Sequence, residues 1–223
     1  YYDIEKNVVQ EKAFIPSTKS FAIAEEELGK MVYYNQDQNL LYILAGGKFY
    51  KIDLTKDEQT VLAKNLEEGQ YTVSADGHLI AYQTSGTINT AQEIKVLNLK
   101  TDEENAVAAK SGEAIRPLGF IGSDFVYGYL RQEDVGHTAA GGELFPMYEL
   151  EIRNSENEVM KTYSADQIYI SDVFIEENMM ILNRVVKSGE TYTVTSQDYI
   201  SSNEEKKTKS ITLEAFSTDL KEK

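Results

Sequence analysis

The stretch Ser74-Ala75-Asp76-Gly77-His78-Leu79-Ile80-Ala81-Tyr82 contains the clearest fold signal in the sequence. Its Asp-Gly step lies between two short apolar runs, residues 71–74 and 79–82, and such a step tolerates the backbone angles of a tight turn. The first run contains Tyr, Thr and Val and the second contains Ile and Tyr, residue types that favour strands. The stretch therefore predicts a β-hairpin.

Three further stretches show the same order of strand, turn and strand. They comprise residues 31–44, 118–127 and 172–182. A second pattern, an alternating strand followed by an acidic turn and another short strand, comes after the first three hairpins at residues 50–62, 94–107 and 148–160. Residues 2–9 show this second pattern without a hairpin before it. Alternation with a period of two indicates strands with one buried face.

The spacing of the second pattern predicts the architecture. Its matched positions, Ile4, Leu54, Leu99 and Ile152, are 50, 45 and 53 residues apart. Repeats of about 40–50 residues with four strands each are typical of propeller blades. We therefore predict an all-β fold of antiparallel four-stranded blades arranged as a β-propeller, either a complete small ring or a partial arc.

The expected organisation is a single propeller-like domain over residues 1–223. Residues 1–16 are predicted to be a half-blade, and residues 17–67, 68–112, 113–166 and 167–203 to be blades. Residues 204–223 are predicted to be a C-terminal tail or a closing strand. Because the sequence opens on half a blade and without a signal segment, we expect it to be part of a larger protein.

Residues 74–82, together with Ile94-Lys95-Val96-Leu97-Asn98-Leu99, resemble the TolB-like and WD-like repeats of bacterial β-propellers. In such repeats a strand that ends in an S-x-D-G turn leads into a second strand, and a third strand alternates. The Trp-Asp dipeptide of true WD repeats is absent, since the sequence contains no Trp. The resemblance implies a bacterial propeller.

Composition limits the classes of partner. The formal net charge is −15, from 22 basic and 37 acidic residues. Such a surface repels nucleic-acid phosphates, so we expect no nucleic-acid partner. No apolar run approaches the roughly 18 residues of a spanning helix, so we expect no membrane insertion by this segment. The absence of Cys fits the cytoplasm and the extracytoplasmic face of a bacterium alike, and we favour the latter.

The sequence offers no catalytic constellation, and we predict that the chain is not an enzyme. It has no G-x-S-x-G nucleophile elbow and no G-x-G-x-x-G or G-K-[ST] phosphate loop. His78 lies in a predicted turn, where a solvated side chain is the ordinary interpretation. Two His residues do not make a zinc site unaided, and the acidic turn at residues 53–58 lacks the glycine of a calcium loop. We therefore expect no cofactor and no metal.

The one candidate binding feature is a long insertion between two strands of the third predicted blade, residues 131–143. Its polar residues Arg131, Glu133, Asp134 and His137 are the candidate binding residues. Long loops on a rigid scaffold often carry binding function. The competing interpretation is a glycine-rich surface loop without a partner.

These observations favour a non-catalytic protein-interaction or scaffold propeller. One alternative is a regulatory or substrate-gating propeller of a larger enzyme or membrane-anchored sensor. Another is a propeller that binds a carbohydrate or small ligand through tyrosines near its channel, although the absence of Trp weakens it because Trp offers the largest stacking face.

Overall fold

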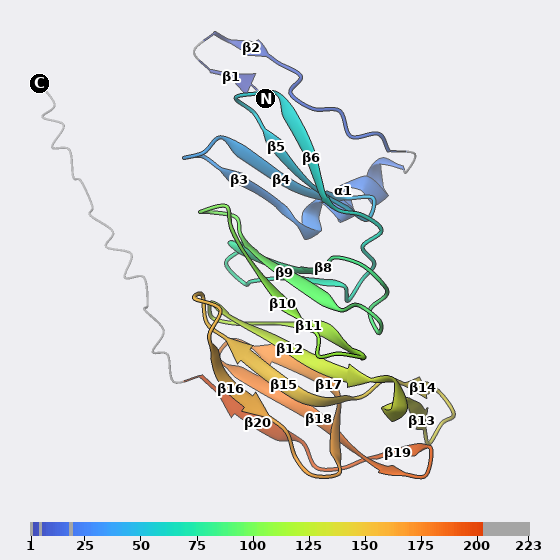
Figure 1. The fold of residues 1–223 in the computed structure, drawn as a ribbon. Coiled ribbons are helices and arrows are strands. Elements are labelled where there is room, and N and C mark those ends of the chain that lie inside the picture. The colour runs from blue at the N-terminus through green and yellow to red at the C-terminus, as the bar shows by residue number, and fades with distance from the viewer. Residues whose placement is uncertain (1, 5, 18–19, 203–223) are drawn as a thin grey trace, which may run out of the picture.

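A computed structural model describes residues 2–4, 6–17 and 20–202. The predicted tail or closing strand at residues 204–223 lies outside the described residues. The first elements are β1 (Tyr2–Asp3), β2 (Val8–Val9) and α1 (Phe21–Lys30). The strands that follow form three sheets (Figure 1).

The first two of these sheets have four antiparallel strands each. One contains β3 (Val32–Asn35), β4 (Leu40–Ala45), β5 (Lys48–Asp53) and β6 (Glu58–Ala63) in that order. The next contains β7 (Tyr71–Val73), β8 (Leu79–Gln83), β9 (Glu93–Asn98) and β10 (Glu103–Ala108), again in chain order. Each sheet is a pair of consecutive hairpins, as the two sequence patterns predict.

The third sheet is larger. It contains β11 (Glu113–Ile121), β12 (Asp124–Arg131), β13 (Gly136–Thr138), β14 (Glu143–Leu144), β15 (Met147–Arg153), β16 (Val159–Tyr163), β17 (Ile168–Glu176), β18 (Met179–Ser188), β19 (Thr191–Val194) and β20 (Asp198–Ser201). A short 3₁₀ turn, η1 (Gln132–Asp134), precedes β13. Strands β11, β12, β15 and β16 follow one another in the sheet like those of the first two.

The hairpin at residues 74–82 shows how sequence dictates these turns. The hydroxyl of Ser74 donates to the carboxylate of Asp76 (2.6 Å) and accepts from the amide of Leu79 (3.0 Å). Asp76 also accepts from the amide of His78 (3.1 Å). Gly77 has a φ of 75°, a left-handed conformation that glycine adopts without steric cost. The motif therefore closes the hairpin through its own side chains.

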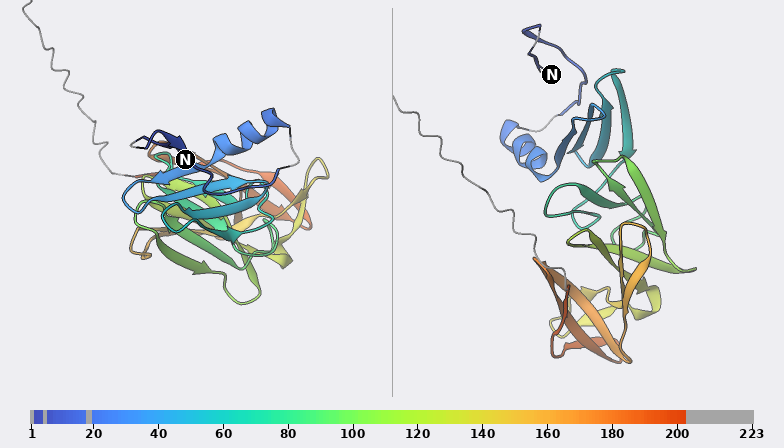
Figure 2. Two further views of the ribbon diagram at one scale, coloured as in Figure 1. Left: turned by 90° about the horizontal axis from the view of Figure 1, so that it is seen from above. Right: turned by 90° about the vertical axis from the view of Figure 1, so that its left-hand side faces the viewer.

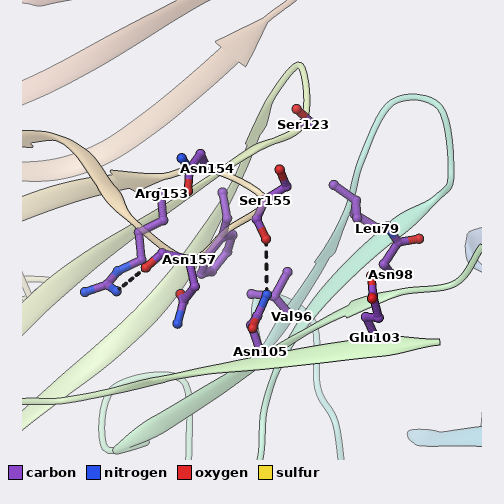
Figure 3. A pocket seen from close by; sticks show the side chains of 11 residues that line it. Leu79, Val96, Asn98, Glu103, Asn105, Ser123, Arg153, Asn154, Ser155 and Asn157 are labelled. Carbon is purple, nitrogen blue, oxygen red and sulfur yellow. Dashed lines mark hydrogen bonds between the residues drawn. The ribbon is translucent and has the colours of Figure 1, made fainter. Parts of the chain in front are cut away.

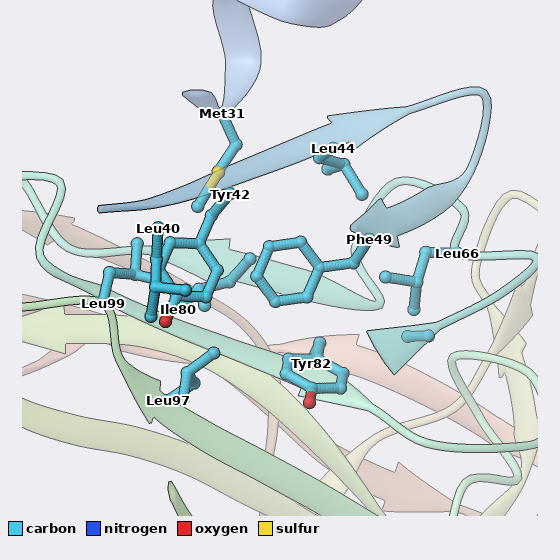
Figure 4. Packing of buried hydrophobic residues seen from close by; sticks show 11 residues of the cluster. Met31, Leu40, Tyr42, Leu44, Phe49, Leu66, Ile80, Tyr82, Leu97 and Leu99 are labelled. Carbon is cyan, nitrogen blue, oxygen red and sulfur yellow. The ribbon is translucent and has the colours of Figure 1, made fainter. Parts of the chain in front are cut away.

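Aromatic side chains fill the space between the first two sheets (Figure 4). Phe49 is fully buried and stacks on Tyr42 of its own sheet, with ring centroids 6.2 Å apart. Its ring meets that of Tyr82 in the second sheet edge to face at 5.3 Å. Such ring pairs add to the stabilisation that burial provides. The two sheets therefore pack face to face through their aromatic residues.

Strand β12 is buried on both faces and joins two further cores. Phe125, Tyr127 and Tyr129 point to one side and pack with residues of the second sheet. Val126 and Leu130 point to the other side and pack with β15, β17 and β18. Residues that alternate along a strand lie on opposite faces, so one strand serves both cores.

The sheets stack one after another, with the β3–β6 sheet and strands β17–β20 at opposite ends of the stack (Figures 1 and 2). Polar contacts join the sheets as well. The side-chain amide of the buried Asn35 donates to the backbone oxygens of Leu99 (3.0 Å) and Lys100 (2.8 Å). The chain is thus built of antiparallel sheets arranged as blades of a partial β-propeller.

The last two predicted blades differ from this scheme in one respect. Residues 113–166 and 167–203 were expected to form separate sheets, but their strands belong to one ten-stranded sheet. Two different strands pair with the same side of β15: Leu150–Arg153 pair with β16, and Met147 pairs with Ile170 of β17. The β13 strand within the 131–143 insertion also pairs with β19. Spacing along the sequence carries no information about such pairings.

Helix α1 lies within the predicted blade at residues 17–67, before the first strand that the sequence patterns predict there. Its sequence is rich in Ala and Glu, which are good helix formers. The helix packs against β4 at the end of the stack. Among the described residues no helix combines the length and the apolar character needed to cross a membrane.

Candidate functional site

The connections between strands differ at the two ends of the sheets. Successive connections of an antiparallel sheet fall at alternate ends. Short turns at residues 74–78, 99–102, 122–123 and 154–158 lie at one end, which we call the turn end. The longer connections at residues 84–92 and 132–146 lie at the other, which we call the loop end. The candidate binding residues belong to the loop end.

The 132–146 connection is folded onto its neighbours. The hydroxyl of Tyr192 donates to the backbone oxygen of Asp134 (2.6 Å), and the ammonium of Lys187 donates to that of Glu133 (3.0 Å). The amide of His137 donates to the backbone oxygen of Glu190 (2.8 Å), beside its parallel pairing with β19. The connection is therefore a braced loop.

Gly136 permits this docking because the loop and β19 approach closely there. A Cβ at this position would lie 2.6 Å from the backbone oxygen of Glu190 and 2.8 Å from the ring of Tyr192. Both distances are shorter than van der Waals contact, and the oxygen belongs to the backbone, which cannot rotate away. Only glycine fits without displacing the loop.

Asp134 is the buried centre of the loop. The residue is 7% exposed, and its Oδ1 accepts a hydrogen bond from the hydroxyl of Tyr169 (2.9 Å). The ammonium of Lys187 lies 3.9 Å from the same oxygen. Burial raises the pKa of Tyr169, and the hydrogen bond to Asp134 raises it further. Asp134 thus fixes the loop to strands β17 and β18.

The structure places the four predicted binding residues in different surroundings. Asp134 is structural, and Glu133 contributes its backbone while its side chain is exposed. Arg131 pairs with Glu113 (3.1 Å), and its guanidinium lies 3.6 Å from the centre of the Tyr148 ring. His137 lies with an exposed side chain on β13. Arg131 therefore faces the base of the loop, whereas His137 is exposed on β13, which lies between β19 and β14.

A cavity of about 140 Å³ lies at the base of the braced loop. It is lined by Asn89, Thr90 and Gln92 of the 84–92 loop, by Gly112, Glu113 and Ala114 at the start of β11, and by Leu130, Arg131, Gln132, Val135 and Phe145. The cavity therefore lies between two sheets at the loop end. Its two charged lining residues, Glu113 and Arg131, are paired with one another.

Arg116 of β11 lies directly behind this cavity. Its Nη2 donates to the side-chain oxygen of Asn89 and to the backbone oxygen of Phe145 (3.5 Å), and both partners line the cavity. Its Nε is buried without a hydrogen-bond partner. Burial lowers the pKa of Arg116, while the negative charge of Asp172 opposes that shift. Sequence analysis missed this residue, although a single arginine just before the predicted hairpin at residues 118–127 was a usable signal.

A smaller cavity of about 80 Å³ lies at the turn end, between the second and third sheets (Figure 3). The side-chain amide of Asn105 donates to the backbone oxygen of Ser155 across it (3.3 Å). Arg153 donates to the backbone oxygen of Asn157 (3.0 Å). The Asn105–Ser155 bond joins the two sheets, whereas the Arg153–Asn157 bond lies within the β15–β16 hairpin, so the polar groups of this cavity serve the packing of the sheets and the hairpin turn.

Within the described ranges, no group of three or more His, Asp or Glu side chains is placed to hold a metal ion. His78 pairs with Asp76 (3.0 Å) in the turn of its hairpin. The two histidines lie on different sheets, at the turn end and on β13.

Comparisons with known proteins give no family for the chain. No family model matches it, and no curated protein sequence matches it. Among solved structures, a protein from Lactobacillus plantarum is similar over 75% of this chain and 54% of its own, with 10% identity and a TM-score of 0.32. Dipeptidyl peptidase 4 of Porphyromonas gingivalis is similar over 86% of this chain and 41% of its own, with 8% identity and a TM-score of 0.29.

The WD40 domain of SCAP from fission yeast is similar over 77% of this chain and 41% of its own, with 9% identity and a TM-score of 0.33. The chain thus spans about half the length of these proteins or less. The fold assignment rests on the strand pairing and packing of this chain itself.

Proposed function

We propose that this chain is a non-catalytic protein-interaction domain that binds its partner at the loop end. The observation that carries the proposal is the braced loop at residues 132–146. Hydrogen bonds from Lys187 and Tyr192 hold its backbone, while the side chains of Gln132, Glu133 and His137 stay exposed. A loop that is ordered before binding loses less conformational entropy when it binds.

The turn end offers a weaker case. Hydrogen bonds from Asn105 to Ser155 and from Asn157 to Ala106 join the two sheets beside its cavity, so these side chains already have partners, and Figure 3 shows the first of these bonds. The loop-end cavity lies instead between two long connections and beside exposed polar side chains. Binding residues often lie on such loops because a rigid scaffold positions them.

The proposal extends to the protein of which this domain is a part, to its type of partner and to its location. The resemblance of residues 74–82 to TolB-like repeats supports a bacterial propeller that is part of a larger protein. An acidic surface with formal net charge −15 supports a protein partner over nucleic acid. We place the domain on the extracytoplasmic face of a bacterium, with which the absence of Cys is compatible.

A peptide-display selection on the purified protein tests the proposal. Affinities of the enriched peptides are compared for Gln132→Trp at the loop end and Ser155→Trp at the turn end, two exposed positions that line the two cavities. We expect Gln132→Trp to weaken binding by about tenfold or more, equivalent to about 1.4 kcal/mol, and Ser155→Trp to leave it unchanged. Equal affinity for both variants contradicts a loop-end site. Reproducible turnover of esterase, peptidase or glycosidase substrates contradicts a non-catalytic domain.

A further inference from the structure

Arg116 differs from the other arginines of the chain in its partners. Arg131 pairs with Glu113 (3.1 Å), Arg153 with Glu151 (3.2 Å) and Arg184 with Asp198 (3.1 Å). Within the part of the chain that the structure describes, Arg116 has no carboxylate within 4.0 Å. Its hydrogen-bond partners are the neutral oxygens of Asn89 and Phe145.

An unpaired charge in such a place is costly. Removing a guanidinium from water without an opposite charge destabilises a folded protein, and a buried donor without an acceptor adds to that cost. Arg116 carries the second cost in full, because its Nε is buried and has no acceptor, and part of the first, because the residue is half-buried. Proteins retain costly groups of this kind where function needs them.

The surroundings of Arg116 indicate where a group that pairs with its charge would lie. Asn89 and Phe145, which contact the guanidinium, are also part of the cavity wall. The paired Glu113 and Arg131 cancel each other, and the other polar side chains of the lining are the neutral Asn89, Thr90, Gln92 and Gln132. The uncompensated charge at the cavity is therefore that of Arg116, offset only by the more distant Asp172.

We propose that Arg116 binds a carboxylate of the protein partner, from an acidic side chain or a chain terminus that enters the loop-end cavity. A carboxylate matches the planar fork of a guanidinium and would replace the neutral oxygen of Asn89 with a charged acceptor. The cavity of about 140 Å³ has room for such a group, since a single water needs only about 10–15 Å³ measured in the same way. This inference rests on the proposed function and names the chemistry of its partner.

The four arginines allow a direct test by NMR. Each contributes one Nε–Hε signal, and Arg→Lys variants assign the four signals. The full chain is titrated at constant ionic strength with N-acetylglutamate N-methylamide, which carries a side-chain carboxylate, with N-acetylglycine, which imitates a chain terminus, and with inorganic phosphate. We expect at least one carboxylate probe to shift the Arg116 signal saturably, while the Arg153 and Arg184 signals stay in place.

The outcomes separate the sources of the anion. A saturable shift with only one of the two carboxylates identifies a side chain or a terminus as the ligand. A shift with phosphate alone overturns the proposal, and so does an Arg116 signal that no probe moves or that moves together with those of Arg153 and Arg184. If peptides bind the loop end while Arg116 does not respond, this inference fails and the proposed function stands.

Two variants separate binding from a structural role. Arg116→Met keeps the length of the side chain and removes the charge, so we expect an unchanged or higher Tm and no stabilisation by the carboxylate probes. Arg153→Met, which breaks an ion pair, is the matched control and should lower Tm. Asp172→Asn removes a competing negative charge and should lower the probe concentration at half-saturation. A drop in Tm for Arg116→Met as large as that for Arg153→Met overturns the proposal.

Discussion

Replacing Phe49 by alanine should destabilise the protein strongly, because this ring lies at the centre of the packing between the first two sheets. Phe49 is fully buried and contacts the rings of Tyr42 and Tyr82. Truncation of a buried Phe to Ala removes its transfer free energy and leaves a cavity, which together cost about 3–5 kcal/mol. Because Phe49 is fully buried between two aromatic rings, we expect a value of about 4 kcal/mol, in the middle of this range.

The assay is equilibrium unfolding in urea followed by far-ultraviolet circular dichroism. Phe174→Ala is the matched control, since that ring is 52% exposed and its loss should change the free energy of unfolding by less than about 0.5 kcal/mol. We expect Phe49→Ala to lower the midpoint without a large change in slope. A loss below about 1 kcal/mol, or one equal to that of Phe174→Ala, refutes the packing of the two sheets through Phe49.

A double-mutant cycle extends this test across the two sheets, since Phe49→Ala combined with Tyr82→Leu should show a coupling of about 0.5–1.5 kcal/mol, and additive effects contradict contact between the rings. Asn35→Ala leaves the backbone oxygens of Leu99 and Lys100 without this donor and should cost about 1–3 kcal/mol in the same urea assay. Asn35→Asp should cost less at low pH, because the protonated side chain can donate a hydrogen bond again. Gly136→Ala should displace the braced loop, seen as faster hydrogen exchange at residues 133–138. Gly142→Ala, where a Cβ makes only an ordinary contact with the Thr138 side chain (3.4 Å), should leave exchange at those residues unchanged. Hydrogen bonds from Ser74 and His78 outweigh burial and lower the pKa of Asp76 from 3.8 to about 2, so its stabilisation is complete above pH 4 and is lost as pH falls through about 2. Asp76→Asn should therefore reduce the difference in stability between pH 5 and pH 2, and an unchanged pH dependence contradicts that role.

Much of the fold follows from local sequence. The Ser74-Asp76-Gly77 turn closes through its own side chains, so nothing distant is needed to predict the hairpin. Alternation along the strands likewise predicts which residues are buried, and Tyr42 and Tyr82 lie in the core as expected of aromatic residues on strands.

What the sequence did not reveal depends on contacts between distant residues. The single pair of Met147 and Ile170 merges the last strands into one sheet, and no spacing predicts it. The candidate loop was identified by its length, but its bracing depends on Lys187 and Tyr192, more than fifty residues further along the chain. The contacts of Arg116 with Asn89 and Phe145 likewise join residues that are distant in the sequence, so its place behind the cavity could not be predicted.

Hydrogen–deuterium exchange of the protein with and without a peptide enriched by display tests the central claim most directly. The account predicts slower exchange on binding at residues 84–92 and 132–146, where the two loops enclose the cavity beside Arg116. Exchange at the turns of the opposite end, residues 74–78 and 154–158, should stay the same. Protection confined to those turns, with none at the two loops, would contradict the loop end as the binding face.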